Sequence, residues 1–288
     1  MSTVIPKSRT IPALLREQAQ QHGPREAVVA GSVRLSYAQL HEQVLHTARA
    51  LAALGVRRGD HAAILMGNRV EWILSFLALQ QLGAVAVGLN TWATPRELEF
   101  ALSHARISCL ISVDSFRRTD YRAVISEMAP RSERLPELRR IVWLAADAQH
   151  PPLLDAQAGE MSWPELMALA PQVALSEVEA AGAVVAPDDV GMLLYTSGST
   201  ATPKGILLQH GHWITNSFHI GERQHVTHED RVWLGVSLFW SFGSVNAMPN
   251  LLSHGGCVVL QEHFDAGVAL ELIERERCSI VYVTPNIC

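Results

Sequence analysis

The sequence has few cysteines, and their spacing signals neither a disulfide framework nor a zinc site. The four cysteines (Cys109, Cys257, Cys278 and Cys288) are scattered along 288 residues without a C-x-x-C pair. Such spacing is typical of reduced thiols, so we expect a cytoplasmic protein. The 13 histidines form no H-x-x-x-H or H-E-x-x-H pattern, which argues against zinc coordination.

The sequence also lacks a basic block, an apolar leader and a long uninterrupted apolar run. A formal net charge of -5 without clustered Lys and Arg gives no field for nucleic acid. Residues 1–10 contain no apolar core of signal-peptide length. The longest apolar region, 73–89, is interrupted by Gln80, Gln81 and Gly83, which is typical of a buried helix running into a strand. We therefore expect no nucleic-acid partner and no integral membrane protein, while the oligomeric state stays open.

Helix-like and strand-like runs alternate along the chain, which predicts an α/β fold with mostly parallel pairing. Capping boxes at Thr94 to Glu97 and Ser162 to Glu165 mark two helix starts, and Ser36 is a further N-cap candidate. Predicted helices cover 11–22, 37–54, 69–82, 95–105, 163–170, 211–222 and 266–277. Predicted strands cover 27–30, 62–66, 84–87, 109–113, 141–144, 191–196, 205–209, 232–236, 257–260 and 280–283.

The regular alternation is lost between 145 and 189, where Ala, Pro, Gly and acidic residues gather. By the rough rule of about 100 to 200 residues per domain, the chain should hold about two units. We predict a first α/β subdomain with its connecting segment at 1–187 and the start of a second subdomain at 188–288.

The segment 195–205, Tyr-Thr-Ser-Gly-Ser-Thr-Ala-Thr-Pro-Lys-Gly, lies between two apolar runs. Gly198 and Gly205 would let the backbone turn sharply and bring N–H groups close to a ligand. Hydroxyl groups that can donate to anionic oxygens come from Thr196, Ser197, Ser199, Thr200 and Thr202. Lys204 supplies a positive charge, so the segment predicts a phosphate-binding loop.

The P-loop pattern G-x-x-x-x-G-K-[ST] does not fit this segment. Counting from Gly198 puts Pro203 at the second glycine and Gly205 at the Ser/Thr position. The apolar run 206–208 that follows is typical of a returning strand, whereas a P-loop opens a helix. A strand, loop, strand phosphate clamp fits better, which makes a P-loop NTPase the disfavoured alternative.

The segment resembles the phosphate-binding loop of the adenylate-forming (AMP-binding) enzymes, which include acyl-CoA synthetases, luciferases and peptide-synthetase adenylation domains. Segments 35–40, 82–90 and 281–285 resemble further elements of that family in the same order. Ala201 departs from the family pattern, which usually has glycine there. A positive φ at Ala201 would cost about 1 kcal/mol.

Segment 237–243, Ser-Leu-Phe-Trp-Ser-Phe-Gly, falls where the family places an aromatic stretch beside its acyl pocket. The resemblance implies that Phe239, Trp240, Phe242 and Gly243 line this pocket. CoA ligases usually carry His at the position of Trp240, and amino-acid-activating domains carry Asp. Without Asp, a substrate ammonium would lack a partner in a desolvated pocket, which argues against an α-amino acid. Simple core packing is the alternative role for Trp240.

The resemblance implies a fold of stacked αβαβα layers and a two-step acid-thiol ligase reaction. The acid would react with ATP to give acyl-AMP and pyrophosphate, and CoA would then take the acyl group. The implied cofactors are ATP, Mg²⁺ and CoA, with Lys204 as the catalytic residue and Ser199 near the metal. The implied nucleotide-binding residues are Thr196, Ser197, Gly198, Ser199, Thr200, Ala201, Thr202, Lys204 and Gly205. Apolar side chains near the pocket favour a hydrophobic acid.

Members of this family continue for a comparable length beyond the strand and turn that 281–285 resembles. The resemblance therefore predicts an N-terminal fragment that lacks the small C-terminal domain and is inactive by itself. Two alternatives stay open. One is a catalytically inactive fragment that binds nucleotide or an acyl ligand, and the other is a carrier-protein-loading adenylation domain.

Overall fold

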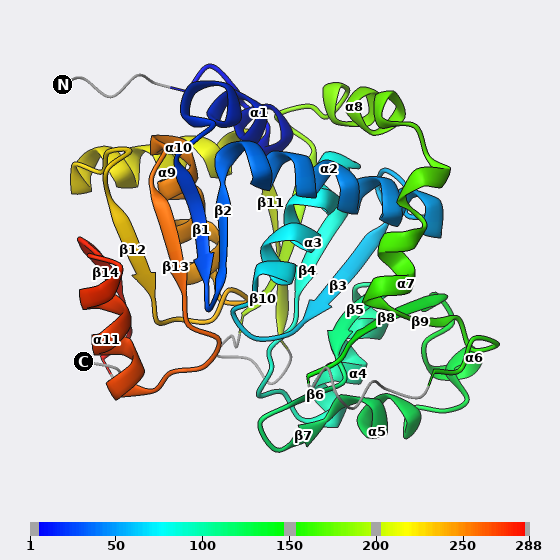
Figure 1. The fold of residues 1–288 in the computed structure, drawn as a ribbon. Coiled ribbons are helices and arrows are strands. Elements are labelled where there is room, and N and C mark those ends of the chain that lie inside the picture. The colour runs from blue at the N-terminus through cyan, green and yellow to red at the C-terminus, as the bar shows by residue number, and fades with distance from the viewer. Residues whose placement is uncertain (1–5, 147–153, 197–202, 286–288) are drawn as a thin grey trace.

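The chain folds into two mostly parallel sheets with helices between and around them (Figure 1). The computed structural model describes residues 6–146, 154–196 and 203–285. Its helices are α1 Ile11–His22, α2 Tyr37–Leu54, α3 Val70–Gln81, α4 Pro95–His104, α5 Tyr121–Ser126, α6 Arg131–Arg134, α7 Trp163–Ala168, α8 Leu175–Ala183, α9 His210–Gln224, α10 Met248–His254 and α11 Ala266–Arg275, with a 3-10 turn at Ala170–Gln172 and a π-helical turn at Phe242–Ala247.

Of the two large sheets, one has five strands in the order β14-β12-β13-β1-β2, and the other has seven in the order β11-β10-β4-β3-β5-β8-β9, while β6 and β7 form a separate two-stranded sheet. In each large sheet one edge strand, β2 or β11, runs antiparallel to its neighbour. The strands are β1 Glu26–Ala30, β2 Val33–Ser36, β3 His61–Leu65, β4 Val85–Gly88, β5 Cys109–Val113, β6 Ser115–Phe116, β7 Thr119–Asp120, β8 Arg140–Leu144, β9 Glu160–Ser162, β10 Val190–Thr196, β11 Lys204–Gln209, β12 Arg231–Leu234, β13 Cys257–Leu260 and β14 Ile280–Tyr282.

Helix α3 occupies the layer between the sheets, because it contacts β1 of one sheet and β3 and β4 of the other. Its residues from Trp72 to Gln81 are all buried, which explains why this stretch is apolar on every side. Helix α10 is also buried, and it contacts β13, α9 and α1. On the outer face of the five-stranded sheet, α11 buries Ala269 and Leu272 against Trp233 and Val259. The predicted stack of αβαβα layers is thus confirmed.

The predicted helices and strands all form, with ends that differ from the prediction by at most two residues. The capping boxes at Thr94 and Ser162 form as expected, and Ser36 forms one with Gln39. Missed elements are β2, β6, β7, β9, α5, α6, α8, α10 and the π-helical turn. The sequence without clear alternation after residue 145 contains α8 and β9 as well as α7.

Strands from both sides of residue 187 contribute to each sheet. β1 pairs with β13 in register Val28 to Val258, and β10 pairs with β4 in register Met192 to Ala86. The predicted division at 187/188 is therefore not a division between the sheets, and as a domain boundary it stays a prediction.

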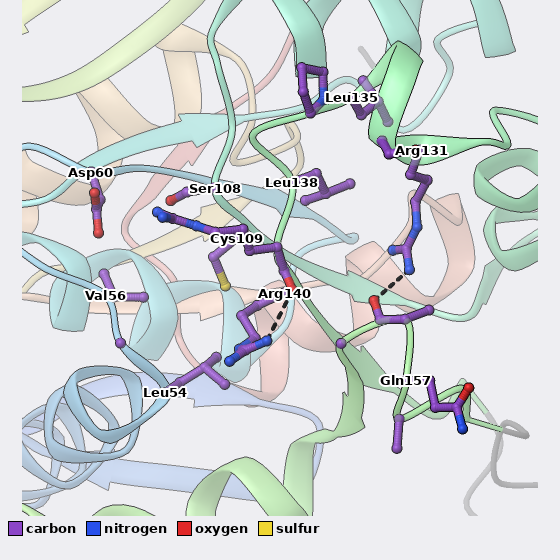
Figure 2. A pocket seen from close by; sticks show the side chains of 17 residues that line it. Leu54, Val56, Asp60, Ser108, Cys109, Arg131, Leu135, Leu138, Arg140 and Gln157 are labelled. Atoms are coloured by element: carbon purple, nitrogen blue, oxygen red, sulfur yellow. Dashed lines mark hydrogen bonds between the residues drawn. The ribbon is translucent and has the colours of Figure 1, made fainter.

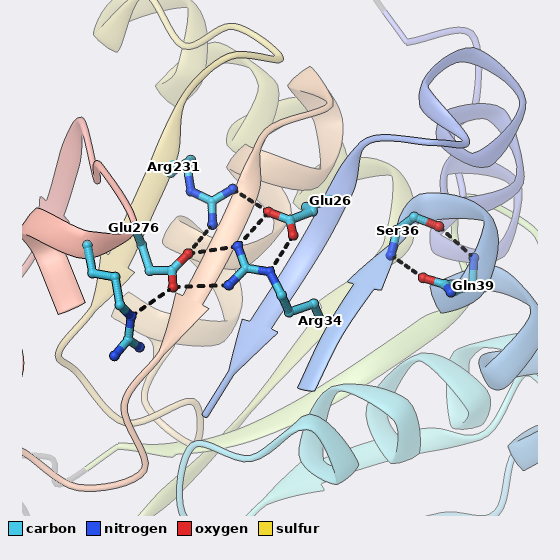
Figure 3. A network of polar contacts seen from close by, with 7 residues as sticks. Glu26, Arg34, Ser36, Gln39, Arg231 and Glu276 are labelled. Carbon is cyan, nitrogen blue, oxygen red and sulfur yellow. Dashed lines mark hydrogen bonds and ion pairs between the residues drawn. The ribbon is translucent and has the colours of Figure 1, made fainter. Parts of the chain in front are cut away.

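Four charged side chains tie the five-stranded sheet to the end of α11 (Figure 3). Arg34 on β2 binds Glu26 on β1 at 2.5 Å and Glu276 at 2.9 Å. Arg231 on β12 binds the same two carboxylates, each at 2.7 Å. The Glu276 side chain is only 4% exposed, and the guanidinium groups around it lower its pKa to about 2.

Within the described residues, no helix combines the length and the apolar character needed to span a membrane.

Candidate active site

The predicted phosphate loop connects two antiparallel strands, β10 and β11. Thr196 faces Lys204 at the end of this hairpin, and Tyr195 faces Gly205. The strand, loop, strand arrangement is therefore confirmed, which separates this segment from a P-loop. Ser197, Gly198, Ser199, Thr200, Ala201 and Thr202 lie outside the described residues, so their predicted contacts with phosphate and Mg²⁺ stay predictions.

Gly205 lies within β11 and not in the turn, which corrects the role expected for it. A Cβ placed on Gly205 would make only ordinary van der Waals contact, at 3.7 Å from the Leu193 side chain. Its φ is not positive either. The backbone geometry therefore does not require glycine at this position.

Lys204 begins β11 with an exposed side chain, and its ammonium forms no ion pair with any described residue. Thr196, opposite it in the ladder, is also exposed. An ammonium and a hydroxyl at neighbouring ladder positions can bind an anionic oxygen together.

A cavity of about 120 Å³ lies next to this hairpin. It is at the carboxyl ends of the parallel strands β4 and β10, the edge at which α/β sheets bind ligands. The hairpin contributes Tyr195, Thr196 and Pro203 to its wall. The remaining wall consists of Gly88, Leu89, Asn90 and Ala93 from β4 and the loop after it, Glu97, Leu98, Phe100 and Ala101 from α4, and Phe239 and Trp240.

Three aromatic rings form one corner of this region. Trp92 meets Phe239 edge-on with ring centroids 5.7 Å apart, and Trp240 lies 5.2 Å from Phe239 and 6.5 Å from Trp92. A Cβ on Gly88 would lie 3.2 Å from the Phe239 Cα. The absence of a side chain at Gly88 therefore lets the backbone of Phe239 pack closely against β4. Trp240 also lines a second cavity of about 440 Å³, which Trp92 lines from the other side.

The four predicted pocket residues separate into two groups. Phe239 and Trp240 line the cavity beside the hairpin. Phe242 instead contacts Tyr282, with ring centroids 4.9 Å apart, and is 37% exposed. Gly243 is buried, and its missing Cβ would lie 2.7 Å from the Ser237 carbonyl oxygen. Neither Phe242 nor Gly243 is among the described residues that line this cavity.

Tyr195 of the hairpin forms hydrogen bonds with polar groups of α4. The Tyr195 hydroxyl lies 2.9 Å from His104 Nδ1 and donates to the Ala101 carbonyl at 3.4 Å. Burial raises the pKa of Tyr195 to about 12, so this hydroxyl stays protonated at neutral pH. Phe100 stacks on His104 with centroids 5.1 Å apart and completes the wall.

Sequence reasoning missed Trp92, Glu97, Phe100 and His104. They belong to the loop after β4 and to α4, about 100 residues before the hairpin, and only the pairing of β4 with β10 brings them together. The usable signal was the position of the segment 82–90, because residues after a parallel strand lie at the ligand-binding edge.

Residues 15–288 match the family model described as AMP-binding enzyme. This chain belongs to that family. It is 32% identical to the acyl-CoA ligase SID4 of Ajellomyces capsulatus over 96% of this chain and 46% of that protein.

Two solved structures are similar to the whole fold. The N-terminal domain of FACL13 from Mycobacterium tuberculosis matches with a TM-score of 0.78 and 27% identity, over 97% of this chain and 64% of that one. O-succinylbenzoate coenzyme A synthetase from Bacillus subtilis, solved in complex with AMP, matches with a TM-score of 0.71 and 25% identity, over 93% and 48%. The chain spans about half the length of the curated relatives it matches.

Proposed function

We propose that the whole protein is an acid-CoA ligase that activates a hydrophobic carboxylic acid with ATP. The observation that carries the proposal is the match to AMP-binding enzymes over 15–288, combined with a hairpin that presents Thr196 and Lys204 beside an apolar cavity. The relatives include a protein named as an acyl-CoA ligase and a CoA synthetase solved with AMP, which supports ATP and CoA as cosubstrates.

In the first step, a carboxylate oxygen of the acid attacks the α-phosphorus of ATP. The bond between the α- and β-phosphates breaks, and pyrophosphate leaves with the electron pair. An anionic nucleophile must approach a polyanion here, so charge neutralisation and positioning dominate the barrier. Lys204 supplies the positive charge that stabilises the departing pyrophosphate, and Thr196 donates to a phosphate oxygen.

In the second step, the thiol of CoA attacks the acyl carbon, its proton is lost to solvent, and AMP leaves. Ser199 is the proposed Mg²⁺ ligand, and this assignment rests on the family resemblance alone. Among the described residues, no group of three or more His, Cys, Asp or Glu side chains suits a metal ion. Hydroxyl groups, phosphates and water are the ligands that Mg²⁺ prefers.

The cavity favours an acid without an ammonium group. Its one described carboxylate belongs to Glu97, whose Oε2 accepts hydrogen bonds from the Thr94 N–H at 2.7 Å and the Thr94 hydroxyl at 2.8 Å. This carboxylate is therefore engaged in the capping box of α4. The aromatic corner of Trp92, Phe239 and Trp240 suits an apolar acyl or aryl group.

The decisive experiment is ATP–pyrophosphate exchange by the whole protein carrying Lys204→Ala, with Lys7→Ala in the whole protein as the matched control. Lys7 is exposed and lies outside the cavity lining, so its loss should leave the exchange rate unchanged. We expect Lys204→Ala to slow exchange by about 100-fold or more, as for the loss of a transition-state charge contact. Equal exchange rates in wild type and Lys204→Ala would refute the proposed role of the hairpin in the ligase reaction.

A hydroxylamine trap across acids of different length identifies the substrate class, because acyl-AMP gives a hydroxamate. Hydroxamate from apolar acids and none from α-amino acids is the expected pattern. Transfer to CoA and not to a phosphopantetheine carrier protein would separate the ligase from a carrier-loading adenylation domain.

A second candidate function is binding of nucleotide or an acyl ligand without turnover. The chain spans about half the length of its relatives, and the hairpin alone could hold phosphate. Binding of ATP without hydroxamate formation would favour this alternative.

We also propose a cytoplasmic location, which is supported by the free thiols of Cys109, Cys257 and Cys278.

A further inference from the structure

A third and larger cavity of about 590 Å³ lies at the opposite end of the parallel strands of the seven-stranded sheet (Figure 2). Its lining includes Ser108 and Cys109 at the start of β5 and Arg140 at the start of β8. β4, β3, β5 and β8 run parallel, so these residues lie at the amino ends of the strands. The candidate active site lies at the carboxyl ends, and no described residue lines both cavities.

Three arginines, Arg131, Arg139 and Arg140, line this cavity. None of them forms an ion pair with a carboxylate in the described part of the chain. The Arg140 side chain has one hydrogen bond within the described residues, from Nη1 to the Arg139 carbonyl at 3.3 Å. Arg131 donates through Nη2 to the Ala158 carbonyl, whereas its Nη1 is buried and finds no partner among the described residues. A buried guanidinium nitrogen without an acceptor is costly, and a bound anion would remove that cost.

The described carboxylates nearby form no ion pair with these arginines, although Arg139 adds to the effect of Arg106 in lowering the pKa of Glu137. Glu137 is engaged by Arg106 at 2.8 Å, outside the cavity lining. Asp60 is the one described carboxylate in the lining, and it accepts the Arg57 N–H at 2.8 Å. The wall therefore carries three positive charges against one negative charge.

The rest of the wall is partly apolar. Leu54 is the last residue of α2 and Val56 lies just after it, whereas Leu135 and Leu138 follow α6. Figure 2 shows Leu54 beside Arg140, Leu138 in the middle of the view and Leu135 at the top, above Arg131. A volume of about 590 Å³ is within the range of small-molecule sites, which is about 300–1,000 Å³.

We propose that this cavity binds an organic phosphate, with the phosphate group on the arginines and an apolar portion against the leucines. Arg guanidinium groups bind phosphate in bidentate geometry, so three of them around one cavity favour a phosphate over a neutral ligand. The site stands apart from ATP binding at the hairpin, and it does not depend on the proposed ligase activity.

The test uses n-hexyl phosphate as the probe, titrated calorimetrically into the 288-residue chain. Inorganic phosphate and hexanol are the two comparison probes, because each carries only one half of the proposed chemistry. The variants are Arg139→Gln and Arg140→Gln, whose side chains are exposed and make few bonds, so the fold should tolerate them. Arg106→Gln is the matched control, since Arg106 is exposed and paired with Glu137 outside the lining.

We expect hexyl phosphate to bind more tightly than either comparison probe. Each of Arg139→Gln and Arg140→Gln should weaken this binding by about tenfold, the usual effect of losing one charged hydrogen bond. Arg106→Gln and Lys204→Ala should leave it unchanged, which separates this site from the hairpin. Unchanged affinity in both Arg139→Gln and Arg140→Gln, or equal affinity for inorganic and hexyl phosphate, would overturn the proposal.

Discussion

Among single residues, His210 is the histidine whose burial has the clearest consequence for stability. It is fully buried at the start of α9, and its Nδ1 accepts the Ile11 N–H at 3.2 Å. Burial lowers the pKa of His210 from 6.5 to about 4. The unfolded chain therefore takes up the proton first as the pH falls. The stability due to neutral His210 is complete above about pH 6.5 and is lost as the pH falls to about 4.

We predict that His210 makes the protein about 3 kcal/mol less stable at pH 4 than at pH 7. Urea unfolding at a series of pH values measures this loss. In His210→Gln the free energy of unfolding should fall less steeply between pH 6.5 and 4, because glutamine does not titrate. Its amide oxygen can still accept the Ile11 N–H. If the free energy of unfolding fell equally steeply with pH in wild type and His210→Gln, the loss of stability would not come from His210.

The candidate site illustrates what single residues in a sequence can and cannot predict. Lys204 was predicted from the hydroxyl- and glycine-rich segment 195–205, whereas Phe239 and Trp240 were predicted from the family resemblance of segment 237–243, and both line the cavity. Glu97 could be predicted only as the capping residue of α4, and nothing in its neighbours indicated that it also lines the cavity. Local chemistry is readable from the sequence, whereas contact between distant segments depends on strand order.

At the scale of elements, helix α8 lacks the N-cap that most of the confirmed helices have. Glu177 accepts the N–H of Ala174, which is one half of a capping box, but the alanine side chain cannot supply the other half. Only Val178 and Gly182 of α8 are buried, so its apolar pattern is weak. These two properties explain why the sequence did not predict this helix, although α4 and α7 were predicted from complete capping boxes.

We predict that Ala174→Ser stabilises the protein by about 1 kcal/mol, because a serine hydroxyl would give the Glu177 N–H, which now donates only to the Ala174 carbonyl at 3.1 Å among the described residues, a side-chain acceptor. Thr94→Ala, which removes an existing cap from α4, should destabilise it by about the same amount. Chemical unfolding of both variants measures the two effects. The idea fails if Ala174→Ser is neutral while Thr94→Ala is destabilising.

The charged network of Figure 3 holds α11 to the five-stranded sheet. Glu276→Gln would keep the shape but remove the charge that Arg34 and Arg231 both contact. We expect Glu276→Gln to lower the free energy of unfolding by about 2 kcal/mol. This is less than for the loss of a fully buried ion pair, because the Arg34 side chain is 45% exposed.

The low pKa of Glu276, about 2, fixes the pH range of this effect. A carboxylate with a lowered pKa stabilises the fold above its unfolded value, near 4.5, and loses that contribution as the pH falls toward 2. The difference between wild type and Glu276→Gln in urea unfolding should therefore persist from pH 7 to 5 and shrink below pH 4. An exposed control, Glu137→Gln, should show a smaller difference at every pH.

At the scale of the whole molecule, the chain passes between the two sheets more than once. It starts in the five-stranded sheet with β1 and β2, builds the seven-stranded sheet from β3, β4, β5 and β8 to β11, and returns with β12 to β14. The alternation of helices and strands predicted the parallel pairing, but not this return. A strand's partner is set by long-range contacts, and the apolar run of β1 would suit either sheet equally well.

This path predicts that the two sheets unfold together. Tyr37 at the start of α2 donates its buried hydroxyl to the Gly256 carbonyl, 2.7 Å away, just before β13. Tyr37→Phe would leave that buried carbonyl with less than its full hydrogen bonding and cost about 1 kcal/mol. Because the sheets share the layer of α3 and one core, the loss should lower protection from hydrogen exchange equally in β13 and in the distant strand β5. Reduced protection in β13 with unchanged protection in β5, measured by mass spectrometry in mild denaturant, would show instead that each sheet opens independently.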